Sequence, residues 1–206
     1  MADAKESAAL SPQAAARFGP LPRLLPLALA FYGALLGAAV AWRSLVDGVG
    51  PWTAGALSPP WPLGARIGAG VALGAALIGT SRVWTSRSEA GRRLAAELGR
   101  LVGGLSTPRV CLLAAASGLA EEAFFRGALQ PRVGWLAASL LFGLAHFHPS
   151  RELRLWSLTA ALAGLALGAL FQASGDLLAP ALAHALLNAV NLRWLARRAN
   201  EDLRAP

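Results

Sequence analysis

EEAFFR, residues 121–126, places two adjacent carboxylates and a guanidinium inside the otherwise apolar segment 110–129. About 20 apolar residues are enough for one membrane-spanning helix. A charged group near the centre of a bilayer costs at least about 3 kcal/mol on insertion scales, so such groups usually face the interior of a helical bundle and have a function there. The stretch therefore predicts a membrane protein with an active site below the lipid surface.

The composition also indicates a membrane protein. The 206 residues are 55% hydrophobic and 15% charged, which leaves too little polar surface for a soluble globule. The net charge of +8 would also suit a nucleic-acid-binding protein, but the basic residues lie between the apolar segments, in the pattern that orients membrane proteins. We predict one polytopic membrane domain in a lipid bilayer and no nucleic-acid partner.

Six apolar segments have the length expected of membrane-spanning helices. They are residues 24–42, 63–80, 110–129, 133–147, 155–173 and 177–195. The predicted fold is therefore all-α, a polytopic membrane helical bundle of about six transmembrane helices. The fourth segment is short, so it either crosses the bilayer steeply or stops within it, where neighbouring helices or water would satisfy its terminal backbone groups.

The basic residues predict how the bundle is oriented. With the N-terminus in the cytoplasm, 15 of the 19 Lys and Arg residues lie on the cytoplasmic side, and both termini are cytoplasmic. The four on the other side are Arg43, Arg66, Arg126 and Arg132. The first apolar segment lacks the short apolar region of a cleavable signal peptide and is expected to be retained. The bias towards arginine suits a GC-rich bacterial genome, so we expect a bacterial cytoplasmic (inner) membrane.

The chain divides into five parts by composition. We predict a disordered N-terminal tail (1–20), two accessory transmembrane helices (21–80), a cytoplasmic amphipathic segment (81–109), a four-helix catalytic core (110–195) and a C-terminal tail (196–206). The segment 81–109 has apolar residues at helical spacing among six arginines, which fits either a helix on the membrane surface or a loop that only sets orientation. Spaced glycines in 63–80 and 155–173 would let these helices approach their neighbours closely.

The two glutamates of the quoted stretch are expected to have different environments. Glu122 and Arg126 are four positions apart and share one helical face, so they can form an ion pair. Glu121 is rotated by about 100° and points to a different neighbour. The paired carboxylate would stay ionised, whereas the other could accept and return a proton, as a general base acting on water must do.

Two further apolar segments each carry a histidine. LFGLAH ends at His146, one turn after Phe142, and HALLN places His184 and Asn188 on one helical face. Polar groups inside a bilayer are usually functional, although an asparagine also serves as a hydrogen bond between helices. The third histidine, His148, precedes a proline and is predicted to lie at a helix end, outside the site.

The motifs EEAFFRG, LFGLAH and HALLN, in this order on successive apolar helices, resemble those of the CPBP family, the CAAX-protease and bacteriocin-processing intramembrane proteases, also called Abi. The resemblance covers roughly residues 111–191. It implies a glutamate-dependent intramembrane endopeptidase with Glu121 as the carboxylate that activates water. Glu122 and Arg126 would be the pair that supports this carboxylate, and His146 and His184 would be the two essential histidines. Asn188 would stabilise the oxyanion.

The resemblance also implies a substrate class. It suggests cleavage near the C-terminus of a membrane-tethered protein or peptide, with Phe125 and Phe142 as candidate apolar walls for substrate binding. No cofactor is expected from the glutamate mechanism. The alternative is zinc-dependent hydrolysis, since two histidines and one glutamate (Glu121, His146 and His184) form a hydrolytic zinc shell with an open position for water.

Other mechanisms and other classes of protein remain alternatives. AASG at residues 115–118 is similar to the serine motif of rhomboid proteases, with Ser117 as nucleophile, although the first glycine of that motif is missing. An aspartyl protease would need two aspartates inside the membrane, but Asp47 and Asp176 fall at loop positions. A non-enzymatic scaffold, an immunity protein or a proton-path protein could also use a buried Glu-Arg-His network.

Overall fold

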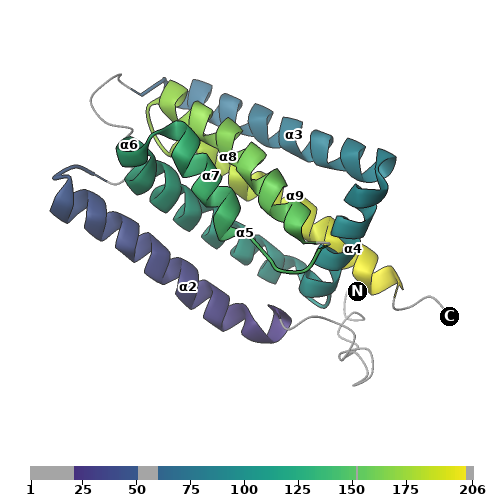
Figure 1. Ribbon diagram of the computed structural model, residues 1–206. Helices are drawn as coiled ribbons and strands as arrows, with labels where there is room; N and C mark the ends of the chain where they lie inside the picture. Colours follow the sequence, from purple (N-terminus) through teal and green to yellow (C-terminus); the bar gives the residue numbers. More distant parts are fainter. Residues whose placement is uncertain (1–20, 51–59, 152, 203–206) are drawn as a thin grey trace, which may run out of the picture.

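The computed structural model describes residues 21–50, 60–151 and 153–202, so the prediction for 1–20 and the end of the 196–206 tail lie outside them. Over these residues the protein is all-α, as predicted, and has no strand (Figure 1). In chain order the elements are α2 (Leu21–Ala41) with a π-helical end η1 (Trp42–Val46), α3 (Leu63–Arg87), α4 (Glu89–Val102), α5 (Thr107–Glu122) with a π-helical continuation η2 (Ala123–Leu129), α6 (Gln130–Val133), α7 (Trp135–Ala145), α8 (Arg154–Ser174) and α9 (Leu178–Asp202).

Each of the six predicted apolar segments contains a helix, but their lengths differ. Among the described residues, three helices are long and apolar enough to cross a membrane: Arg23–Val46, Leu63–Arg87 and Arg154–Ser174. A fourth is added if α4 and the helix that follows it, which meet at a bend of 107°, form one broken span. Helix α7 has 11 residues and rises about 17 Å, so it cannot cross a hydrocarbon core of about 30 Å alone.

The bundle is built around contacts of α9. This helix packs against α3, α4, α5 and α8, while α2 packs against α5 and α7 against α8. Figure 1 shows α2 and α3 at opposite sides of the bundle, with the helices of the predicted core between them. The two predicted accessory helices therefore flank the segment that carries the motifs.

Helix α4 forms within the predicted amphipathic segment. Ser88 caps it, because its side chain accepts a hydrogen bond from the backbone N–H of Gly91 at 3.3 Å. The apolar side chains of Leu94 and Val102 are buried, and Leu98 packs against the same cluster as Val102. The apolar face of α4 thus packs onto the rest of the protein, and Figure 1 shows the helix crossing one end of the bundle.

Small residues set how closely helices approach α9. A Cβ on Gly70 would lie 2.7 Å from the carbonyl oxygen of Ala179, and one on Gly118 would lie 2.9 Å from the backbone nitrogen of Ala185. By contrast, Gly64 has nothing within 4 Å of that position. The predicted close approach is made by Gly70 and Gly74 of α3 and by Gly164 and Gly168 of α8, where a neighbouring atom lies within 3.4 Å of a Cβ position, but not by Gly64 or Gly68. Gly118 of α5 makes a further close approach that the sequence did not single out.

We expect Gly118→Ala to lower the melting temperature of the protein in detergent. The new Cβ would meet the backbone of Ala185, which cannot rotate away, so α5 and α9 must separate; overpacking of this kind costs about 1–3 kcal/mol. Gly79→Ala is the matched control, because no atom lies within 4 Å and alanine favours a helix by roughly 0.5–1 kcal/mol. Equal melting temperatures for the two variants would contradict the role of Gly118.

The arginines on the predicted non-cytoplasmic side all have carboxylate partners. Asp47 pairs with Arg43 at 2.8 Å and with Arg132, and Asp176 pairs with Arg66. The two aspartates therefore join helix ends across the bundle, in agreement with their predicted loop positions. The fourth of these arginines belongs to the site described next.

Candidate active site

The predicted polar residues converge where α5 ends. Glu121 and Glu122 are the last residues of α5, and the chain continues into the π-helical segment η2, which carries Arg126. Wider π-helical turns are frequent at functional sites. His146 lies at the end of α7 and His184 on α9, so three separate helices supply the site.

Glu122 lies at the centre of a buried ion-pair network. Its Oε1 is 3.0 Å from Nη1 of Arg126 and 2.8 Å from Nδ1 of His184. The side chains of Glu122 and Arg126 are 0% and 1% exposed. The guanidinium also donates from Nη2 to the carbonyl of Gly164 at 3.2 Å and stacks 4.3 Å from the ring centre of Phe142. The carboxylate of Glu122 is thus charge-compensated and closed to a substrate.

Glu121 has a different environment, as the sequence predicts. Its Oε2 lies 3.8 Å from Nε2 of His146 and 3.8 Å from Nε2 of His184. This oxygen is buried and has no hydrogen-bond partner among the described residues. The side chains of Glu121 and His146 are 10% and 16% exposed, whereas that of Glu122 is fully buried.

Hydrogen bonds to the other ring nitrogens set the tautomers of both histidines. Nδ1 of His146 lies 2.8 Å from the carbonyl oxygen of Phe142, which can only accept, so Nδ1 carries the hydrogen. Nδ1 of His184 likewise donates to the carboxylate of Glu122. An imidazole that is neutral with this tautomer directs the lone pair of Nε2 towards Oε2 of Glu121. Three acceptors then face one another, an arrangement that suits a donor such as water.

Aromatic rings hold the imidazoles in place. The ring centre of Phe142 lies 4.6 Å from that of His146 and 5.8 Å from that of His184, and Trp156 packs edge-on against His146 at 5.2 Å. Phe125 packs against Phe142 at 5.1 Å. Both phenylalanines are buried and support the site residues, while their role in substrate binding stays a prediction.

Asn188 lies one turn beyond His184 on α9 and donates from Nδ2 to Oγ of Ser117 at 2.9 Å. The Ser117 hydroxyl itself donates to the carbonyl of Ala114 at 3.3 Å. No hydrogen bond joins Ser117 to a histidine among the described residues, so the contacts that activate a serine nucleophile are not formed there. His148 is exposed and pairs with Ser150 at 3.0 Å, outside the site as predicted.

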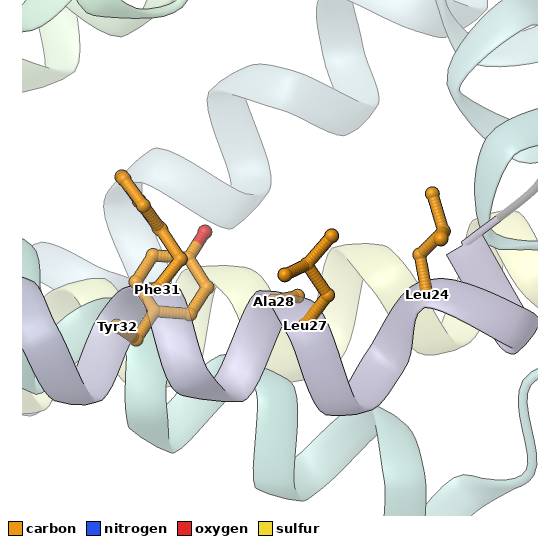
Figure 2. Close-up of a pocket in the computed structure, with 5 residues that line it drawn as sticks. All are labelled: Leu24, Leu27, Ala28, Phe31 and Tyr32. Atoms are coloured by element: carbon orange, nitrogen blue, oxygen red, sulfur yellow. The ribbon is translucent and has the colours of Figure 1, made fainter.

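Helix α2 brings one residue to the site that the sequence did not single out. The hydroxyl of Tyr32 lies close enough to the carboxylate of Glu121 for the two groups to interact electrostatically. Tyr32 is the only tyrosine of the chain and lies within an apolar helix, which is the signal that could have identified it. It also borders an open pocket of about 460 Å³ lined by Leu24, Leu27, Ala28, Phe31 and Tyr32 (Figure 2).

The residues as placed do not form a zinc shell. Two ligand atoms that share a tetrahedral zinc are about 3.3 Å apart, whereas Oε2 of Glu121 is 3.8 Å from each Nε2. In the described parts of the chain, no three His, Cys, Asp or Glu side chains are grouped closely enough to hold a metal ion.

Comparison with known proteins identifies a related family for this part of the chain. Residues 104–190, which contain all six predicted catalytic residues, match the family described as type II CAAX prenyl endopeptidase Rce1-like. The resemblance to the CPBP family is confirmed. The matched family is described as one of endopeptidases, and the apolar helices indicate a membrane protein. Helices α2, α3 and α4 precede the CPBP-like segment.

A curated relative matches a stretch of similar length. The chain is 35% identical over 85 residues to the uncharacterized protein YpbD of Bacillus subtilis (strain 168). The aligned region makes up 41% of this chain and 44% of YpbD, so the chain spans less than half of that relative. No solved structure matches the chain.

Proposed function

We propose that this protein is an intramembrane endopeptidase that hydrolyses a peptide bond of a membrane-associated substrate with water activated by Glu121. One observation carries the proposal. Oε2 of Glu121 is buried, lacks a partner among the described residues and faces Nε2 of both His146 and His184. A general base needs a free carboxylate beside the water that it activates, and Glu121 meets this requirement.

The proposed reaction needs a base for water, a hydrogen-bond donor for the oxyanion and a proton for the leaving nitrogen. Glu121 takes a proton from water as the water oxygen adds to the carbonyl carbon of the substrate, and an oxyanion forms. The amide of Asn188 donates a hydrogen bond to this oxyanion. A proton then passes to the leaving nitrogen from Glu121 or through His146, the carbon–nitrogen bond breaks, and a carboxylic acid and an amine are released. His184 is oriented by the hydrogen bond between its Nδ1 and Glu122 and faces Glu121 with Nε2.

Glu122 is proposed to support the reaction rather than to act as the base. Both Arg126 and His184 contact its Oε1, and ion pairing keeps a carboxylate ionised and weakly basic. Glu122 thus orients His184 and balances the charge of Arg126 inside the bundle. Two adjacent carboxylates in such different environments can take two different roles.

The proposal also extends to the class of substrate and to the membrane in which the protein lies. The CPBP-like segment favours a membrane-tethered protein or peptide that is cut near its C-terminus. The charge pattern favours a bacterial cytoplasmic membrane with both termini in the cytoplasm. In that orientation the segment 81–109, which contains α4 and six arginines, would lie at the cytoplasmic surface.

The proposal can be tested with a mixture of membrane proteins in place of a single defined substrate. The full chain and its Glu121→Gln variant would be reconstituted separately in phosphatidylethanolamine and phosphatidylglycerol vesicles that contain membrane proteins of a bacterium. Newly formed amino termini would then be labelled and sequenced. We expect new termini in or beside apolar segments with the wild-type protein and none with the variant. Identical sets of termini would contradict an endopeptidase that uses Glu121, and the most strongly cleaved sequence would serve as a reporter peptide.

We expect the cleavage rate to survive removal of zinc. The three candidate ligands are farther apart than in a tetrahedral zinc shell, so dialysis against 1,10-phenanthroline should leave the rate within about twofold and the protein without stoichiometric zinc. Cleavage of the reporter peptide and elemental analysis of the same sample would be measured together. A rate that is lost on dialysis and restored by added zinc would establish the metal-dependent alternative instead.

A further inference from the structure

We infer that Ser117 is a positioning residue that fixes the amide of Asn188, so that its nitrogen rather than its oxygen faces the reacting groups. This inference rests on the proposed function, since it assigns Asn188 to the oxyanion. It gives Ser117 a role that differs both from a nucleophile and from a small residue that only permits close packing.

The hydrogen bonds of Ser117 leave it one possible role towards Asn188. A serine hydroxyl has a single hydrogen, and Ser117 donates this hydrogen to the carbonyl of Ala114. Its oxygen can therefore only accept from a further partner. An asparagine amide has one end that donates and one that accepts, so Ser117 selects the Nδ2 end of Asn188, at 2.9 Å. A flipped amide would place two acceptors against each other.

The selected orientation leaves a second N–H for the substrate. Nδ2 of Asn188 carries two hydrogens, and Ser117 takes one of them. The other has no acceptor among the described residues. A donor whose direction is fixed before the reaction is worth more to a developing oxyanion than one that must reorient.

The geometry of the two helices places the Asn188 amide on the side of the helix pair that carries the general base. Ser117 lies one turn before Glu121 on α5, and Asn188 lies one turn after His184 on α9. The pairs Ser117 with Asn188 and Glu122 with His184 show that the two helices run antiparallel. Their close approach is made at Gly118, where a Cβ would lie 3.0 Å from Cα of Ala185. The Asn188 amide and the Glu121 carboxylate are thus held on the same side of one helix pair.

Ser117 is buried, at 4% exposure, so the hydrogen bond to Asn188 does not compete with bulk water. A buried serine is not unusual here, because Ser139 on α7 is 1% exposed. Ser139 donates to the carbonyl of Trp135 at 2.8 Å and contacts none of the proposed catalytic side chains through its hydroxyl. Ser139 therefore offers a matched control with the same chemistry and similar burial.

The test compares kcat and KM of the reconstituted full chain for the reporter peptide. We expect Ser117→Ala to lower kcat about tenfold with KM within twofold, and Ser117→Thr, which keeps the hydroxyl, to stay within threefold of wild type. Asn188→Ala should lower kcat about 10²- to 10³-fold. The double variant Ser117→Ala, Asn188→Ala should be no slower than Asn188→Ala, because Ser117 acts only through that amide. Ser139→Ala should leave kcat unchanged.

Several results would overturn the inference. The first is a wild-type kcat for Ser117→Ala. The second is a double variant whose kcat is lower than that of Asn188→Ala by the same factor that Ser117→Ala alone produces. The third is a Ser117→Ala variant as inactive as Glu121→Gln, which would indicate a serine nucleophile. A failure of the proposed function looks different. In that case Glu121→Gln would still cleave the peptide at the wild-type rate, whatever the Ser117 variants do.

Discussion

Glu121→Gln is expected to lower the rate of peptide cleavage by about 10²- to 10⁴-fold, the range that general acid–base catalysis contributes. The substitution keeps the shape of the side chain but removes its ability to take a proton from water. The fold should remain intact, because Oε2 of Glu121 has no hydrogen-bond partner among the described residues and the variant no longer buries a charge. Cleavage of the reporter peptide and thermal melting in the same detergent would be measured together.

Glu89→Gln is the control for this experiment. Glu89 lies at the start of α4 and its side chain is 67% exposed, so its substitution should leave cleavage unchanged. A Glu121→Gln protein that melts like wild type and cleaves at more than a tenth of the wild-type rate would show that this carboxylate is not the base. The Glu121→Gln variant would also be inactive if the protein used zinc, because Glu121 would then be a zinc ligand. The dialysis experiment distinguishes the zinc-dependent mechanism from the metal-free one.

Arg126→Met is expected to give the largest loss of stability in the chain. The guanidinium is 1% exposed and compensates the fully buried carboxylate of Glu122. Its removal leaves a buried charge without its partner, which typically costs about 3–5 kcal/mol. Methionine fills part of the same volume beside Phe142, so the loss would come mainly from the charge. The free energy of unfolding in mixed detergent, measured by denaturant titration, would report this change.

Two further variants distinguish a charge effect from a packing effect. Arg93→Met removes an ion pair with the same four-residue spacing, but Arg93 and Glu89 are 69% and 67% exposed, and exposed pairs of this kind contribute only about 0.3–0.5 kcal/mol. Glu122→Gln combined with Arg126→Met removes both buried charges and should recover part of the lost stability. If the double variant is as unstable as the sum of the single variants, the loss is due to packing and the charge argument is wrong.

The sequence predicted much of the site because its chemistry depends on residue type and local spacing. Glu122 and Arg126 are separated by one helical turn, so their pairing follows from the helix alone. His146 and His184 stand out since polar groups are rare inside apolar segments. The convergence of these residues on one another was expected from the motifs, and the structure places Oε2 of Glu121 3.8 Å from both imidazoles.

Other parts of the site depend on contacts between segments far apart in the chain. The interaction of Tyr32 with Glu121 requires α2 to pack against α5, and no local pattern encodes that neighbour. The bond from Asn188 to Ser117 likewise depends on how closely α5 and α9 approach. The hydrogen on Nδ1 of each imidazole follows from its acceptor, which is visible only once the partner helix is in place.

The length and hydropathy of the segments, together with the spacing of charges within them, determined the all-α membrane fold and the residues of the site. These properties are local, because a bilayer selects each helix by its own apolar length. Only the tertiary structure decided which segments are long enough to cross a membrane unaided, where the apolar face of α4 is buried, and which of the two glutamates faces both imidazoles with an unpaired oxygen. Those outcomes depend on side-chain packing between helices, where a single Cβ at Gly118 would shift one helix against another.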